Sequence, residues 1–333
     1  MRAKFILTLA PTLFLVLALG LGEIWARSLV PRSDQNPFRT SPHDELPSVL
    51  APNLELQWQG PHVQTNSLGF RGPEIPEPNP KKKRIAILGD SFVFGSGVEW
   101  EGTIGVQLER SIQALGRQVD VLNFGVPGYN TGHNAWVLEN KVLEHAPDLV
   151  VYVAFANDTD AHKSYGIVDP ERIPDPLALF FFRSALSECV LVGVRGLVAK
   201  CGVLLNRHTP ANQAAIYNGE GGQRVRDGLI RMRAACKEAG IPLVTAIYPF
   251  MVSPSRNPYL LIEQGMARDA AELGLPVVRL ERAFSGVDRR QLWANPIFDS
   301  HPSHEANALV GKWMGEAVAQ ILDRHEQRAS GEE

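Results

Sequence analysis

Residues 84–95 read RIAILGDSFVFG, and this segment indicates how the rest of the chain folds. Residues 85–88 are a short apolar run, which is typical of a strand buried on both faces of a parallel sheet. Glycine, aspartate and serine follow at once, so the strand ends in a polar turn that leads toward a helix. Because ligands bind beyond the carboxyl ends of such strands, the polar residues of this turn are candidates for a functional site.

Similar apolar runs recur along the chain and alternate with helical patterns. The predicted strands are Ile85–Leu88, Val119–Phe124, Leu149–Phe155, Leu243–Tyr248 and Val277–Leu280. Helices are predicted near residues 100–115, 133–145, 222–239 and 259–273, and apolar residues spaced by three and four predict a last helix from Ala306 to Ile321. Five such units predict an α/β fold, a three-layer α/β/α sandwich with a five-stranded parallel sheet.

Composition and charge narrow the class of protein. Of the 333 residues, 44% are hydrophobic and 21% are charged, which is typical of a globular chain and excludes a disordered one. The 33 basic and 36 acidic side chains give a net charge of −3. A protein without a basic surplus has no general attraction to polyanions, so we expect no nucleic-acid partner.

The N-terminal 26 residues are expected to be a membrane anchor. Residues 5–22 carry no charge and would form roughly 27 Å of helix, close to the thickness of a bilayer core. Arg2 and Lys4 precede this run and favour a cytoplasmic N-terminus, with the remaining chain periplasmic or at the cell surface. A cleaved signal sequence ending near Ala18 and Gly20 competes with the anchor and would give a secreted protein. A buried terminal helix is the third interpretation.

Composition also predicts the domain organisation. Ten prolines in residues 27–83 forbid long helices and predict a proline-rich stalk with a short hairpin near residues 57–70. The sheet domain is expected over residues 84–325, followed by a polar tail at 326–333. Residues 170–215 are predicted to be an apolar helical insertion that packs as a cap. Within it, Cys189 and Cys201 could form a disulfide across a chain reversal, or could be small buried apolar residues.

Polar residues that follow the predicted strands suggest nucleophilic catalysis. Ser91 follows the first strand, and a serine hydroxyl becomes an effective nucleophile when a histidine accepts its proton and a carboxylate orients the histidine. His301 and Asp299 could supply both groups, and His304 is the rival base. The backbone N–H groups of Ser91 and Gly128 and the amide of Asn157 are candidate donors to a tetrahedral oxyanion.

Each of these residues also has a structural interpretation. Ser91 could merely cap a helix, Gly128 and Asn157 could be turn residues, and His301 could be a solvated loop histidine. A metal site built from Asp299, His301 and His304 would have poor geometry without remote ligands, so we expect no metal. Glycines 89, 95 and 97 match no nucleotide-binding motif, and no cofactor is expected.

The order of these residues resembles the four sequence blocks of SGNH hydrolases, the GDSL branch of esterases and lipases, over residues 84–322. The corresponding residues are Gly89-Asp90-Ser91, then Gly128 five residues after Asn123, then Asn157-Asp158, and finally Asp299 with His301-Pro302. The resemblance implies the flavodoxin-like fold of that family, with Ser91, His301 and Asp299 as the catalytic triad and with Ser91, Gly128 and Asn157 as the oxyanion hole. Residues 66–72, NSLGFRG, and the N-terminal apolar run are similar to membrane-anchored bacterial members.

Two positions depart from the family pattern. Phe155 stands where the family usually has a glycine, two residues before the asparagine. Asp299 lies two residues before His301, whereas the commonest spacing is three; the shorter spacing resembles relatives that act in polysaccharide O-acetylation.

The expected function is that of a serine esterase that cleaves short-chain O-acyl esters, such as acetyl esters, through an acyl-serine intermediate. An extracytoplasmic location suggests envelope glycans or lipids as substrates, and the apolar cluster Phe180–Phe182 could line an acyl pocket, touch lipid or simply be core. Two alternatives remain open: an O-acetyltransferase of an extracytoplasmic polysaccharide, and a non-catalytic glycan-binding protein.

Overall fold

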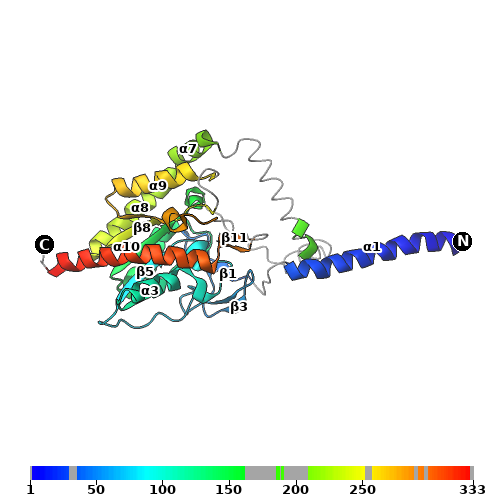
Figure 1. The fold of residues 1–333 in the computed structure, drawn as a ribbon, viewed down its shortest axis with the longest axis horizontal. Coiled ribbons are helices and arrows are strands. Elements are labelled where there is room, and N and C mark those ends of the chain that lie inside the picture. Colours follow the sequence, from blue (N-terminus) through cyan, green and yellow to red (C-terminus); the bar gives the residue numbers. More distant parts are fainter. Residues whose placement is uncertain are drawn as a thin grey trace. The chain divides into compact units, whose positions relative to one another are not determined.

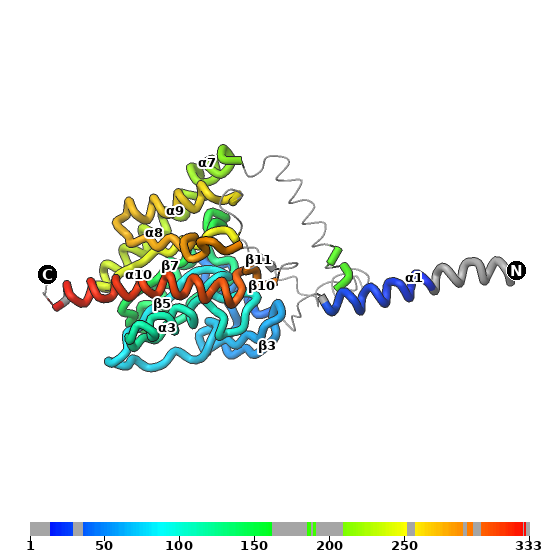
Figure 2. The backbone as a smooth tube through the Cα atoms, viewed as in Figure 1, coloured from blue at the N-terminus to red at the C-terminus, as the bar shows by residue number. Residues whose placement is uncertain are grey.

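The computed structural model describes most of the chain (Figures 1 and 2). The described residues are 2–29, 36–161, 185–187, 189–190, 209–251, 257–288, 292–295 and 299–330, without the side chains of 2–13, 29, 299–300 and 329. The chain divides into two units. One contains Met1–Arg32 and Val168–Arg207, and the other contains Ser33–Ile167 and His208–Glu333.

The larger unit is built on a five-stranded parallel sheet with the order β6-β5-β7-β8-β9. Its strands are β5 (Lys83–Leu88), β6 (Val119–Asn123), β7 (Leu149–Ala154), β8 (Leu243–Ile247) and β9 (Val277–Arg279). All five predicted strands and the predicted α/β fold are therefore confirmed. The strand order reverses direction beside β5, so the carboxyl ends of β5, β6 and β7 lie at the switch point, where ligands bind in such folds.

Helices cover both faces of the sheet. The helices of this unit are α2 (Ser91–Phe94), α3 (Ile104–Ala114), α4 (Thr131–Val137), α7 (Pro210–Asn218), α8 (Glu220–Ala239), α9 (Leu260–Glu272) and α10 (His304–Ser330). A π-helix at Leu138–Val142 and a 3-10 helix at Leu143–His145 continue α4. Further 3-10 helices lie at Trp100–Gly102, Ala156–Thr159 and Leu280–Phe284. The last helix extends to Ser330, so residues 326–330 of the predicted tail are helical.

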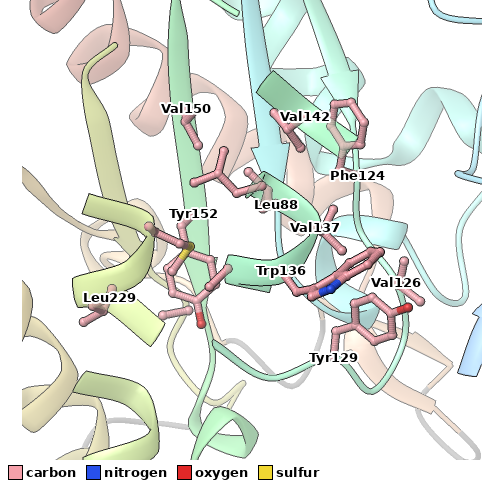
Figure 3. Packing of buried hydrophobic residues seen from close by; sticks show 14 of the residues in the cluster. Leu88, Phe124, Val126, Tyr129, Trp136, Val137, Val142, Val150, Tyr152 and Leu229 are labelled. Atoms are coloured by element: carbon pink, nitrogen blue, oxygen red, sulfur yellow. The ribbon is translucent and has the colours of Figure 1, made fainter. Parts of the chain in front are cut away.

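The two sides of the sheet bury different apolar clusters because successive side chains of a strand point to opposite faces. Ile85 and Ile87 of β5 pack in a cluster with α3 and α10, which lie side by side. Leu88 packs on the opposite face, in a cluster that includes Tyr152 of β7 and Leu229 of α8 (Figure 3). Both faces of the central strands are thus covered by apolar side chains, and the polar side chains lie at the strand ends.

The segment before the sheet differs from the predicted stalk. Strand β1 (Phe38–Thr40) pairs with β2 (Ser48–Leu50), and β3 (Glu55–Gln57) pairs with β4 (His62–Gln64), close to the hairpin predicted near residues 57–70. Four apolar residues of this segment are buried in the same cluster as β5 and β7: Phe38, Leu50, Val63 and Phe70. The prolines do prevent long helices here, but they do not prevent the short strands from packing onto the sheet domain.

The smaller unit is described mainly by α1 (Arg2–Leu29). The Glu23 carboxylate accepts hydrogen bonds from the N–H groups of Ala185 and Leu186, both at 3.1 Å. Among the helices that the structure describes, none is long and apolar enough to cross a membrane, so the anchor predicted for residues 1–26 is not supported. Most of the insertion predicted at 170–215, including Phe180–Phe182 and Cys201, lies outside the described residues, as does the end of the tail at 331–333.

Candidate active site

Ser91 lies at the carboxyl edge of the sheet, where β5 passes into the short helix α2. The preceding Asp90 caps this helix, since its Oδ1 accepts a hydrogen bond from the Phe92 N–H at 2.9 Å. A side chain at Gly89 would lie 2.5 Å from Val93, so this tight entry into the helix requires glycine. Ser91 is only 4% exposed, and the capped turn before α2 fixes its position.

His301 contacts Ser91 although 210 residues separate them in the sequence. The Nε2 atom of His301 lies 2.8 Å from the Ser91 Oγ, which is hydrogen-bonding distance. His301 belongs to β11 (Asp299–Pro302), which pairs with β10 (Trp293–Asn295) in an antiparallel hairpin. The Phe92 ring packs edge-on against the imidazole, with ring centroids 5.4 Å apart. When the imidazole proton is on Nδ1, Nε2 can accept the hydroxyl hydrogen of Ser91.

The other two residues of the predicted last block occupy different places. The backbone of Asp299 pairs with Asn295 at the start of β11, but its side chain is not among those described, so its orienting role stays a prediction. His304, the rival base, lies in the first turn of α10, and its Nε2 is 3.2 Å from Nε2 of Gln107 on α3. Of the two histidines, His301 is the one that the structure brings to Ser91.

Asn157 is tied to the nucleophile turn through Asp90. It follows β7 in the turn Ala156–Thr159, and its Nδ2 donates to Asp90 Oδ2 at 2.8 Å. Burial raises the pKa of Asp90, while the hydrogen bonds from Phe92 and Asn157 and the nearness of His301 oppose that rise. Because a carboxylate only accepts, the Asn157 NH2 group faces Asp90, and its second N–H is available to another acceptor.

Gly128 lies in the loop after β6, and this loop is held against α2. The Val126 N–H donates to the Gly89 carbonyl at 3.2 Å, and the Asn123 Nδ2 donates to the Val93 carbonyl at 2.9 Å. The backbone of Gly128 has a φ of +83°, which glycine adopts without strain. Within the described part of the chain, the Gly128 N–H has no hydrogen-bond acceptor. The loops after β5, β6 and β7 thus meet at one edge, as the sequence pattern predicts.

A row of aromatic rings beside the Ser91–His301 pair was not predicted as a unit. Phe155, at the family's usual glycine position, stacks on Phe92 with centroids 4.1 Å apart. Phe250 continues the row at 6.4 Å from Phe155, and Tyr259 lies 5.1 Å from Phe250. The three rings beyond Phe92 are partly exposed, so they present an apolar surface that continues from the Phe92 ring beside His301. In the sequence, only the departure from the family's glycine at Phe155 pointed to this surface.

Asp158 stabilises the turn after β7 that carries Asn157. Its Oδ2 accepts from the Tyr152 hydroxyl at 2.6 Å and from the Phe155 N–H at 2.9 Å, and it is buried. Burial raises its pKa well above the ordinary range, and the nearby Asp90 raises it further. Among the described side chains, no group of three His, Cys, Asp or Glu residues could hold a metal ion.

Comparison with known proteins gives the family. The model of the GDSL-like lipase/acylhydrolase family matches residues 87–309, which include the turn of Ser91, the loop of Gly128, Asn157 and His301. The chain belongs to this family. It is therefore an ester hydrolase of the SGNH type, and the family predicted from the sequence blocks is confirmed.

Three solved structures are similar to this chain at low sequence identity. A lipase/acylhydrolase from Enterococcus faecalis is 19% identical, with 72% of this chain and 96% of that one covered and a TM-score of 0.44. A family 3 carbohydrate esterase from Clostridium thermocellum is 16% identical, with 73% and 98% covered and a TM-score of 0.46. The esterase EstA from Pseudoalteromonas is 15% identical, with 73% and 100% covered and a TM-score of 0.44. No curated protein sequence matches the chain.

Proposed function

We propose that this SGNH hydrolase is a serine esterase that cleaves O-acyl esters through an acyl-Ser91 intermediate. The observation that carries the proposal is the 2.8 Å distance between the Ser91 Oγ and the His301 Nε2. As the Ser91 oxygen attacks the ester carbonyl carbon, its proton passes to His301 Nε2, and the carbonyl oxygen becomes an oxyanion. Asp299 would orient the resulting imidazolium from its place two residues earlier in β11.

The oxyanion needs hydrogen-bond donors at the edge of the sheet. The N–H of Ser91 has no acceptor within α2, because it is the first residue of that helix. The Gly128 N–H and the second N–H of Asn157 supply two further donors, and Asp90 supports the direction of the Asn157 amide. One such donor typically contributes about 3–4 kcal/mol to the stability of the transition state.

Collapse of the tetrahedral intermediate breaks the ester bond. The imidazolium of His301 returns its proton to the leaving alcohol oxygen, and the acyl group remains on Ser91. Water then attacks the acyl carbonyl, with the same histidine as base and then acid, and a carboxylic acid and free Ser91 result. The cycle leaves the enzyme unchanged and consumes one water per ester.

The proposed substrates are short-chain O-acyl esters, such as acetyl esters, on envelope glycans or lipids. The partly exposed rings of Phe155 and Phe250 favour contact with the apolar acyl part of an ester. The extracytoplasmic location rests on residues 2–22 alone, where two basic residues precede an uncharged apolar run, as they do in a signal sequence. Fractionation of cells that express the full chain tests it: recovery with cytoplasmic markers would contradict the location and leave the chemistry of the site unaffected.

Labelling with a fluorophosphonate, which reacts with activated serines, tests the role of Ser91. We expect the wild type to be labelled and Ser91→Ala to lose both labelling and hydrolysis of p-nitrophenyl acetate. Ser96→Ala is the matched control, because Ser96 is a second buried serine just beyond the same short helix. It should be labelled like the wild type. Equal labelling of Ser91→Ala and wild type would remove Ser91 as the nucleophile.

A further inference from the structure

Arg71 is a buried cation that the proposed catalytic steps do not use. It belongs to the NSLGFRG segment, residues 66–72, which precedes the sheet, and it is only 2% exposed. Its Nη1 donates to the carbonyl oxygens of Phe94 at 3.2 Å and Gly95 at 2.5 Å. Its Nη2 donates to those of Val98 at 2.7 Å and His62 at 3.1 Å. Three of these four acceptors lie at the end of the helix that begins with Ser91, or just after it.

The helix α2 has only four residues, so its own hydrogen bonds fix it weakly. Its last carbonyls lack helical partners, as they do at any helix end. Asp90 holds the start of the helix, and Asn123 holds the Val93 carbonyl in its middle. Arg71 supplies the partners at the other end, where a positive charge also favours the partial negative charge of the carbonyls.

The surroundings of Arg71 are shaped to hold a guanidinium group. The Asn66 Oδ1 accepts from the N–H groups of Leu68 and Phe70, both at 3.0 Å, and this fixes the turn that delivers Arg71. Gly95 has a φ of +84°, and a Cβ there would lie 3.3 Å from Arg71 Nη1. The guanidinium carbon also lies 5.0 Å from the centre of the Phe94 ring, within the range of a cation–π contact.

We propose that Arg71 is a positioning residue for the esterase reaction: by binding the carbonyls at the end of α2, it keeps the Ser91 Oγ within reach of His301. The inference rests on the proposed role of Ser91. A displacement of about 1 Å at a reacting atom can cost roughly 100-fold in rate, so a loosened helix end would slow attack without changing the groups that bind substrate. The segment that precedes the sheet would then help, through Arg71, to position the nucleophile.

The variants Arg71→Lys and Arg71→Ala test the proposal. A lysine carries one ammonium group and cannot reproduce the planar fork that reaches carbonyls on both sides. For p-nitrophenyl acetate we expect kcat to fall roughly 10- to 100-fold in Arg71→Ala, with KM within about twofold of wild type. The second-order rate of fluorophosphonate labelling should fall in parallel, and Arg71→Lys should be slowed roughly 10-fold.

Arg84 provides a matched control for loss of stability. It is 3% exposed, and its guanidinium also donates to backbone carbonyls, those of His145 and Pro76, but it lies at the start of β5, the end opposite Ser91. Unfolding in urea should show that Arg84→Ala loses stability while its folded form keeps a wild-type labelling rate. Millimolar guanidinium chloride should restore part of the labelling rate of Arg71→Ala and leave Arg84→Ala unchanged.

Each outcome separates the inference from the proposed function. If the wild type is not labelled at all, the role of Ser91 fails first. If the wild type is labelled and folded Arg71→Lys and Arg71→Ala react at its rate, the positioning role is refuted. The same holds if Arg84→Ala loses as much rate as Arg71→Ala and guanidinium rescues neither. Should Arg71→Ala fail to fold, the rate of Arg71→Lys decides between these outcomes.

Discussion

At the scale of single residues, Asp90 makes two separate hydrogen bonds that shape the site. One carboxylate oxygen caps the helix of Ser91, and the other accepts from Asn157. In Asp90→Asn, the new amide can still cap the helix, but its NH2 group would face the NH2 group of Asn157. We therefore expect stability to change little and kcat/KM for p-nitrophenyl acetate to fall roughly 100-fold, as when one oxyanion donor is lost.

A double-mutant cycle checks that this loss passes through Asn157. If Asp90 acts by orienting the Asn157 amide, then Asn157→Ala and the double variant Asp90→Asn/Asn157→Ala should have similar kcat/KM values. Full additivity of the two single losses would show that Asp90 acts on the reaction by another route. Urea unfolding of all three variants shows whether each one is folded during the assay.

At the scale of elements, the segment of residues 36–83, which contains the two hairpins, should behave as part of the core and not as a stalk. Phe70 is 6% exposed and packs edge-on against Phe124 at the end of β6, with centroids 4.9 Å apart. Phe70→Ala should lower the free energy of unfolding by about 3–5 kcal/mol, because a large buried ring leaves a cavity. Urea denaturation measures the change.

Leu68 is the matched control, since it lies in the same turn but is 39% exposed. Leu68→Ala should change the free energy of unfolding by less than about 1 kcal/mol. A small effect of Phe70→Ala, similar to that of Leu68→Ala, would show that residues 36–83 behave as the stalk that their proline content predicts.

The contrast between the strands and this N-terminal segment shows what a sequence pattern can predict. A strand buried on both faces, such as Leu149–Ala154, must be apolar throughout, so its signal is local. The strands β1 to β4 have three residues each, with one or two of them buried, and such short runs cannot be told from loops. The proline content of residues 27–83 predicts that long helices are absent, but it does not predict what this segment packs against.

At the scale of the whole molecule, topology explains which site residues could be predicted. Ser91, Gly128 and Asn157 each follow a parallel strand, so the sheet alone brings them to one edge. His301 comes from a hairpin after the last parallel strand, and its meeting with Ser91 was predicted from residue chemistry and the family blocks. The contacts of Arg71 were not predictable, because they join side chain and backbone across 9 to 27 residues without a pattern in residue type.

The stability of the folded molecule should depend on pH through its buried carboxyl groups. The pKa values of Asp158 and Asp90 are both raised by burial, above the ordinary value of 3.8. Above that value an unfolded chain has lost these protons while the folded chain still holds them. The free energy of unfolding therefore falls as pH rises through this window, by at most about 1.4 kcal/mol per pH unit for each group, and levels off above the folded pKa.

Asp158→Asn should remove one of these contributions. An asparagine oxygen can still accept from the Tyr152 hydroxyl and the Phe155 N–H, but the side chain cannot ionise. Urea unfolding between about pH 4 and about pH 8 should show that the variant gains stability relative to wild type as pH rises. Glu305→Gln should give the opposite sign at more acidic pH, because the hydrogen bond from Ser303 lowers the pKa of Glu305 below its ordinary value of 4.5, and the contribution of Glu305 is lost as pH falls below that value. A pH-independent difference between wild type and Asp158→Asn would mean that Asp158 titrates alike in the folded and unfolded chain, so that burial does not hold its proton.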